Sequence, residues 1–281
     1  MLLLHNQVRD YAWGAPDGMA ALVGSTPSGG HEAELWIGTH PAAPSLVAGD
    51  AQGRTLAEVI AAEPARWLGE DLAAAGHTAL PFLLKVLAVG SPLSLQAHPT
   101  AAQAEAGFDR EEAAGVPIDA PQRTYRDRGA KPEMLVAIEE SWGLCGFRPR
   151  TEAATLVESL GVPTLEPLVH VLRSEGDRAH RIALGWLLHL QSTGRDSVAT
   201  GVAGAVSSID PDDLDDPRAW VHRIAAAFPD DPLALAPLLL EVVHLAPGDA
   251  LHLPAGYLHA YLRGAGVELM AASDNVLRGG L

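Results

Sequence analysis

Apolar residues in the first 150 positions occur in short runs that are separated by glycine, proline and aspartate. The runs have the length of strands and are bounded by turn-forming residues; they read ELWIGTH, PSLVAGD, FLLKVLAV, LSLQAHP and PEMLVAI. One longer stretch, TLAEVIAAEPARWLGEDLAAA, has its apolar positions at helical spacing instead. Residues 1–150 are therefore predicted to form the first part of a β domain with one helical interruption.

The pattern changes over residues 151–235 and changes back from residue 236. TEAATLVESLG begins on a threonine suited to cap a helix and ends on a glycine, and DRAHRIALGWLLHLQSTG and DPRAWVHRIAAAFPDD repeat the helical spacing. Strand-like runs then return in LLLEVVHLAPGDALHLPAGYLHAYLRGAGVELMAAS. We predict a mostly β fold in which an all-α helical domain (151–235) is inserted and the β domain resumes over 236–281.

Composition narrows the class of protein. The chain has 281 residues, 48% of them hydrophobic and 19% charged, which is ordinary for a globular protein. A net charge of −16 repels nucleic acid and anionic membranes, so neither is expected as a partner. The single cysteine, Cys145, leaves no intramolecular disulfide, and the amino-terminal apolar run is too short for a signal peptide. We therefore expect a cytoplasmic protein.

The clearest local motif lies in the resumed β segment. Gly248, Pro254, Gly256 and His259 are separated by five, one and two residues. A glycine turn, a short strand and a Pro-Gly bend would deliver His259 onto the next strand, where it shares a face with Tyr261. This spacing is similar to the second motif of cupin jelly-roll barrels, in which the histidine is a metal ligand.

In cupin barrels the other ligands come from a His-x-His pair on an upstream strand and from a later glutamate. Here Gln96 and His98 occupy the positions of the pair, and Glu133 begins a later strand. Taken alone, Gln96 and His98 would be interpreted as a solvent-facing strand pair. With Glu133 and His259 they form a candidate set of nitrogen and oxygen ligands, which suits zinc, with manganese, cobalt or iron as substitutes.

Several longer stretches together resemble type I mannose-6-phosphate isomerases. They are YAWG, AELWIGTHPAAPS, LPFLLKVLAVGSPLSLQAHP, GFDREEAAGVPIDAPQRTYRDRGAKPEMLVAI, GFRP and VELMAASDNVLRGGL. The resemblance implies a cupin-type jelly-roll barrel with one Zn²⁺ per chain, which interconverts mannose 6-phosphate and fructose 6-phosphate. It also implies that Gln96, His98, Glu133 and His259 hold the metal and that Arg278 is catalytic.

This chemistry needs a base, a cation and groups that hold a phosphate. Exchange between aldose and ketose through an enediol moves a carbon-bound proton, and a base with a pKa near neutrality serves best. Our candidate is Glu268, a carboxylate in an apolar strand, where burial would raise its pKa. Arg278 is the candidate to stabilise negative charge or bind phosphate. Lys131 is a further catalytic candidate, which would contact hydroxyl or phosphate groups and assist ring opening. Asp274 and Ser94 are further candidates for the substrate pocket.

Alternative interpretations remain open for these residues. Glu268 is alternatively a structural carboxylate paired with Arg263 or Arg278, and Lys131 a surface lysine. The cluster HEAELW is interpreted as an exposed acidic turn rather than as a metal site. A metal- and sugar-phosphate-binding cupin without catalysis, or an iron-dependent cupin oxygenase, are the rival functions.

The chain departs from the family pattern after RGGL. In the family this stretch continues into a Thr-Pro-Lys segment and a second β domain, which are absent here. We therefore expect the strand that carries Arg278 to end frayed, some apolar surface to be exposed, and metal binding to be better preserved than turnover. We expect a monomer whose partner is a small sugar phosphate.

Overall fold

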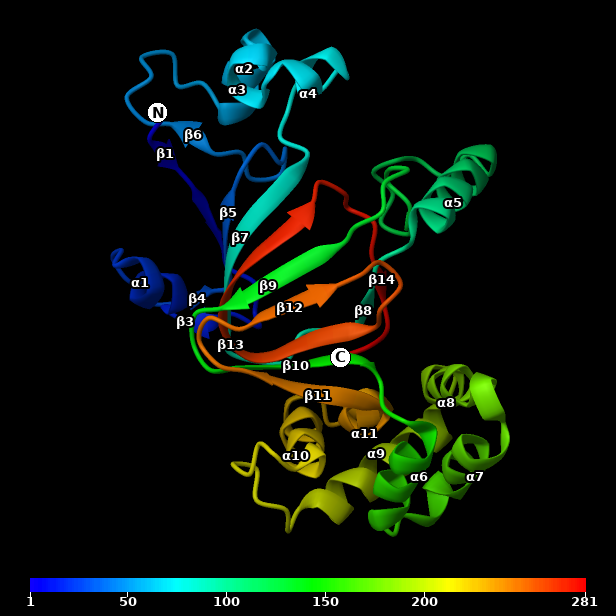
Figure 1. Cartoon of the computed structure of the whole chain (residues 1–281). Coiled ribbons are helices and arrows are strands. Elements are labelled where there is room, and N and C mark those ends of the chain that lie inside the picture. Colours follow the sequence, from blue (N-terminus) through cyan, green and yellow to red (C-terminus); the bar gives the residue numbers. More distant parts are fainter.

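The computed structural model describes residues 1–281, and one large sheet dominates the arrangement of its strands (Figure 1). The strands are β1 (Leu4–His5), β2 (Gln7–Arg9), β3 (Ala15–Pro16), β4 (His31–Glu32), β5 (Glu34–Ile37), β6 (Leu46–Val47), β7 (Phe82–Val89), β8 (Gln96–Ala97), β9 (Glu133–Ala137), β10 (Ser141–Phe147), β11 (Leu240–Leu245), β12 (Ala250–Leu253), β13 (His259–Ala271) and β14 (Leu277–Arg278). Ten of them form the large sheet, in which β11, β10, β13, β7, β5 and β2 are neighbours in that order. Strands β8 and β9 also pair with β13, β12 pairs with β9, and β14 pairs with β8. Every pairing is antiparallel.

Helices make up more of the chain than strands do. The α-helices are α1 (Gly18–Val23), α2 (Leu56–Ala62), α3 (Pro64–Leu68), α4 (Glu70–Ala74), α5 (Ala101–Ala113), α6 (Arg150–Ser159), α7 (Glu166–Ser174), α8 (Ala179–Leu188), α9 (Ser192–Val206), α10 (Pro217–Ala227) and α11 (Ala236–Leu239). Short 3₁₀ turns cover Pro163–Leu165, Gly176–Arg178 and Pro232–Leu235. No helix is long and apolar enough to cross a membrane.

Strand β13 connects the two parts of the sheet. Its first residues pair with β10, and its later residues pair with β7 and β9. The register shifts between Trp142 and Gly143 of β10, which inserts an extra residue in β13 and reverses the alternation of its faces. Because of this bulge, odd-numbered His259 and even-numbered Glu268 both reach the same cavity.

A glycine makes the change of partners on β13 possible. Gly264 has a φ of +114°, and a Cβ there would lie 2.3 Å from Ser141 Oγ. Only glycine adopts this conformation without strain and without a clash. The bend at Gly264 therefore depends on the absence of a side chain.

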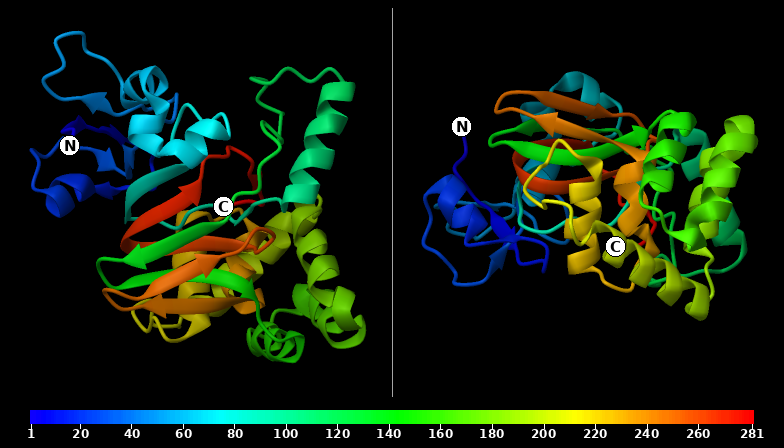
Figure 2. Two further views of the ribbon diagram at one scale, coloured as in Figure 1. Left: turned by 45° about the horizontal axis from the view of Figure 1, so that its top comes forward. Right: turned by 90° about the horizontal axis from the view of Figure 1, so that it is seen from below.

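The helices from α6 to α11 gather at one side of the sheet, against β10 and β11 (Figures 1 and 2). One cluster of 26 buried residues unites them, and Trp220 and Leu168 from helices pack there with Leu144 and Leu262 from strands. Burying such large apolar side chains stabilises the fold by about 1.5–3 kcal/mol each. The helices thus share a core with the strand that carries His259.

The structure corrects one predicted helix and adds another that was not predicted. The helical stretch over residues 55–75 is broken into α2, α3 and α4, because Pro64 begins α3 and Gly69, with a φ of +85°, ends it. Helix α5, which follows Thr100 and its capping box, is not among the predicted elements.

The segment that carries Arg278 is tied down, so the expectation that it frays is wrong. Leu277 and Arg278 pair with β8, Gly279 N donates to the carbonyl of Leu95 at 2.9 Å, and Leu281 N donates to Asp231 Oδ2 at 2.9 Å. Apolar surface is exposed elsewhere, on the outer face of β9 and β13, at Met134, Val136 and Leu269.

Candidate active site

Three side chains from three separated parts of the chain meet in the interior. His98 follows β8, Glu133 begins β9 and His259 begins β13, and each is at most 4% exposed. His98 Nε2 lies 3.1 Å from Glu133 Oε1, and His259 Nε2 lies 3.3 Å from Glu133 Oε2. Their ligand atoms all lie within 4.8 Å of one another. Such a compact buried set of nitrogen and oxygen atoms is typical of a divalent metal site.

The hydrogen bonds of the His98 and His259 rings indicate that these two side chains and Glu133 need a cation between them. Nδ1 of His98 lies 2.9 Å from the carbonyl of Asn275, and Nδ1 of His259 lies 3.1 Å from the carbonyl of Tyr257. A carbonyl only accepts, so in the neutral rings Nδ1 carries the proton and Nε2 presents a lone pair to the carboxylate. His98 Nε2 is buried without a hydrogen-bond partner of good geometry. A cation at this point would satisfy all three groups, so the residues fit a metal.

The Glu133 carboxyl is held as an anion. Burial alone would raise its pKa, but the adjacent His259 and His98 rings and the charge of Lys131 outweigh burial and hold that pKa well below its usual range. The Lys131 ammonium lies 3.3 Å from Glu133 Oε1. Gln96 is the backbone partner of both His259 and Arg278 in the sheet and lines the same cavity.

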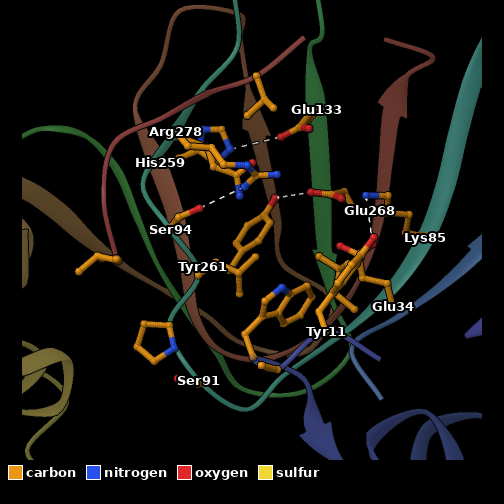
Figure 3. Close-up of a pocket in the computed structure, with 18 of the residues that line it drawn as sticks. Tyr11, Glu34, Lys85, Ser91, Ser94, Glu133, His259, Tyr261, Glu268 and Arg278 are labelled. Carbon is orange, nitrogen blue, oxygen red and sulfur yellow. Dashed lines mark hydrogen bonds and ion pairs between the residues drawn. The ribbon is translucent and has the colours of Figure 1, made fainter. Parts of the chain in front are cut away.

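A cavity of about 690 Å³ opens beside these residues, and every other predicted site residue lines it. Figure 3 labels Ser94, Glu268 and Arg278 among them. At the rim of the cavity Arg278 donates to Ser94 Oγ over 3.1 Å. Asp274 Oδ1 lies 3.0 Å from His40 Nε2, and this hydrogen bond lowers the pKa of the Asp274 carboxyl, against the effect of partial burial. The cavity therefore combines a metal-type site with cations and hydroxyl groups, which suits an anionic, polar ligand.

Glu268 lies deep in the cavity and is 4% exposed. Burial, supported by the charge of Glu133, raises the pKa of its carboxyl to about 7, although Lys85 opposes the rise. The hydroxyl of Tyr261 donates to Glu268 Oε1 over 3.0 Å, and burial together with the charge of Glu268 raises the pKa of Tyr261 well above its usual value. A buried carboxyl with a pKa near neutrality has the property required of a general base.

Comparison with known proteins identifies the family. A family model described as "Phosphomannose isomerase type I, catalytic domain" matches residues 1–150. Mannose-6-phosphate isomerase of Escherichia coli K12 is 37% identical over 100% of this chain and 71% of its own length. The chain belongs to the type I phosphomannose isomerase family. This confirms the resemblance that the sequence motifs indicated.

Further members of the type I phosphomannose isomerase family extend the comparison. The human mannose-6-phosphate isomerase is 31% identical over 98% of this chain and 68% of its own length. A crystal structure of the Salmonella typhimurium isomerase with fructose 6-phosphate and zinc matches with a TM-score of 0.88 and 34% identity, over 99% of this chain and 70% of that one. A zinc-bound mannose-6-phosphate isomerase matches with a TM-score of 0.89 and 34% identity, over the same shares of the two chains.

Two charged residues of the site were missed by sequence analysis. Glu34 and Lys85 line the cavity, and Lys85 Nζ lies 3.3 Å from Glu34 Oε2. Burial would lower the pKa of Lys85, but the charges of Glu34 and Glu268 outweigh it and raise that pKa. Each is a charged residue inside an apolar strand, and this was the signal that could have found them.

The interpretation of HEAELW as an exposed acidic turn is wrong. Glu32 and Glu34 are 5% and 7% exposed, whereas His31 is exposed. Glu32 accepts backbone hydrogen bonds from Ala20 and Ser28, and Glu34 faces the cavity. Glu268 pairs with neither Arg263 nor Arg278. It accepts a hydrogen bond from Tyr261 and lies directly opposite Lys85 in the sheet.

Proposed function

We propose that this chain is a zinc-dependent aldose–ketose isomerase that interconverts D-mannose 6-phosphate and D-fructose 6-phosphate through an enediol. One observation carries the proposal: the cavity places a metal-type set of His98, Glu133 and His259 beside a buried carboxyl, Glu268, with a pKa of about 7. Family membership supplies the substrate class, since the relatives are mannose-6-phosphate isomerases and one structure holds fructose 6-phosphate with zinc.

His98, Glu133 and His259 would hold the zinc ion, with Gln96 as a neutral oxygen ligand. When bound, zinc supplies Lewis-acid polarisation of the substrate's oxygen atoms. The carbonyl groups of Asn275 and Tyr257 fix the tautomers of the two histidines, so that each Nε2 is ready to bind the ion. One anionic ligand among the four leaves a positive charge in the site, which favours an oxyanion.

Glu268 would move the proton. Its carboxylate takes the C2 proton of the open-chain aldose and returns it to C1, while the hydroxyl proton passes from O2 to O1 and the carbonyl moves from C1 to C2. The hydroxyl of Tyr261 orients the carboxyl, and Lys85, which faces Glu268 across the sheet, keeps its pKa from rising further. A proton on this carboxyl exchanges with solvent through the cavity between the two transfers.

Arg278 and Lys131 would provide positive charge for the substrate. The guanidinium of Arg278 offers a planar set of donors that suits phosphate or a developing oxyanion. Lys131 stands beside Glu133 and reaches the hydroxyl groups or the phosphate. Ser94 holds the Arg278 guanidinium, and Asp274, at the same rim, accepts from substrate hydroxyls.

The proposal also covers the type of barrel, the division into domains, the oligomeric state and the compartment. We propose a cupin-type jelly-roll barrel formed by residues 1–150 and 236–281, with residues 151–235 as an inserted helical domain. The segregation of helices α6 to α11 to one side of the sheet supports this division. A monomer that binds neither nucleic acid nor membrane, in the cytoplasm, agrees with the net charge of −16 and the single cysteine.

An assay with controlled metal content tests the function. The chain is stripped with a chelator, reloaded with one equivalent of zinc, and given fructose 6-phosphate. We expect mannose 6-phosphate to form only after zinc is restored. Equal rates before and after stripping would refute the metal-dependent mechanism, and zinc binding without conversion would support the non-catalytic alternative.

A further inference from the structure

Asn275 lies behind the site and has no exposed surface, although it takes no direct part in the chemistry described above. We propose that Asn275 is a positioning residue, whose side chain locks the segment bearing Asp274 and Arg278 to the loop that leads to Lys131 and Glu133. This inference rests on the proposed zinc site and isomerase activity. One buried amide would thus align the metal ligands with the cationic side chains that bind the substrate.

The side chain of Asn275 uses both of its ends on the same loop. Its Oδ1 accepts from the backbone N–H groups of Arg126 (2.7 Å) and Asp127 (3.3 Å). Its Nδ2 donates to the carbonyls of Asp127 (2.8 Å) and Gly129 (3.0 Å) and lies 3.2 Å from Asp127 Oδ1. A buried amide with this many partners fixes the loop in one position, because any displacement leaves polar groups unpaired.

The backbone of Asn275 makes the connection to the metal set. Its carbonyl accepts the Nδ1 proton of His98 at 2.9 Å, and this contact sets the tautomer and the orientation of the ring. A shift of the side chain away from its loop therefore moves the carbonyl that aims His98 at Glu133. The side chain acts on the ligand through the position of its own main chain.

Asp127 closes the same junction from the other side. Its carboxylate accepts from Ser273 Oγ at 3.0 Å and from Asp274 N at 3.1 Å, so the residues that flank Asn275 are held too. Asp274 is one residue before Asn275, and Lys131 is two residues after Gly129. The junction thus fixes the distance between the two segments that carry the cations of the cavity.

The substitution Asn275→Asp tests the proposal with almost no change in volume. It keeps the two bonds accepted from Arg126 and Asp127, but it turns two donated bonds into contacts between acceptors and places a second carboxylate beside Asp127. We expect the zinc dissociation constant, measured by competition with a chromophoric chelator, to rise about 10- to 100-fold. We also expect kcat/KM at saturating zinc to fall, since Asp274 and Arg278 move with the segment.

Two further variants separate positioning from general stability. Ser141→Ala removes a buried hydroxyl that donates to the carbonyls of Glu139 and Ala265 at the opposite end of the sheet. It should lower the melting temperature but leave zinc affinity and KM unchanged. Adding Asp127→Asn to Asn275→Asp restores a donor between the two side chains and should recover part of the zinc affinity.

The proposal would be overturned if Asn275→Asp kept the zinc affinity of the wild type while its melting temperature fell like that of Ser141→Ala. Asn275 would then be a structural residue. If Asn275→Asp does not fold, Asn275→Ser, which adds no charge, is measured in its place against the same two criteria. A wild-type chain that binds zinc without isomerising would refute the proposed activity alone. The comparison of zinc affinities would still decide the role of Asn275.

Discussion

Glu268→Gln removes the one buried carboxyl whose pKa lies near neutrality while preserving its shape. In the metal-free chain the pKa of this carboxyl rises from 4.5 to about 7 on folding, so between these pH values the folded state binds a proton that the unfolded state does not. The free energy of unfolding must therefore fall as pH rises through this window. At ~1.4 kcal/mol per pH unit, the contribution of Glu268 amounts to about 3 kcal/mol.

The assay is urea unfolding of the metal-free wild type and of Glu268→Gln at pH 4.5 and pH 8. From pH 4.5 to pH 8 the free energy of unfolding of the variant should rise by about 3 kcal/mol relative to that of the wild type. Any pH-independent difference that the amide introduces does not affect this change. Glu139→Gln is the matched control, because Glu139 is exposed, and it should show no such gain. A difference between wild type and Glu268→Gln that does not change with pH would refute the assignment of the raised pKa to Glu268.

The same variant tests the catalytic role of Glu268. With zinc restored, Glu268→Gln should bind sugar phosphate and zinc normally, because the amide keeps the size of the side chain. Its kcat should fall by about 10²- to 10⁴-fold, the usual contribution of a positioned base. Unchanged turnover would assign the proton transfer to another residue.

Three other substitutions test the remaining parts of the site. Glu133→Ala should abolish stoichiometric zinc binding, measured by metal analysis after dialysis, whereas Glu139→Ala should retain it; zinc retained by Glu133→Ala would refute the ligand set. Arg278→Lys keeps the charge but loses the planar donors, so kcat/KM for mannose 6-phosphate should fall about 10-fold or more; an unchanged value would exclude a specific guanidinium contact. Lys85→Met removes the cation that lowers the pKa of Glu268, so the acidic limb of the pH profile of kcat/KM should move about one unit upward; a profile that does not move would contradict this coupling.

The residues that sequence analysis brought together are those with a local signal. His259 stands in a spaced Gly-Pro-Gly pattern, Gln96 and His98 alternate on one strand, and Glu133 heads another. Each signal depends only on residues near it in the chain, and the family motifs supplied the link between them. The carboxyl of Glu268 was also found locally, because it interrupts an apolar strand.

What was missed depends on pairing between distant strands. Lys85 stands opposite Glu268 on one side and opposite Trp36 on the other, and nothing in its own strand specifies either partner. Glu34 reaches the cavity only because β5 pairs with β7. The β-bulge that turns Glu268 toward the same cavity as His259 is set by the register against β10. Such register is fixed by the assembled sheet, so a single sequence does not reveal it.

The proposed function depends on the transfer of a proton between C1 and C2 of a sugar phosphate with the help of a bound metal. The most direct measurement is ¹H NMR of fructose 6-phosphate incubated with the zinc-loaded chain in D₂O. We predict that mannose 6-phosphate appears with deuterium at C2, and that neither product nor label forms after chelation. Product that forms without any deuterium, or at the same rate after zinc is removed, would contradict the account.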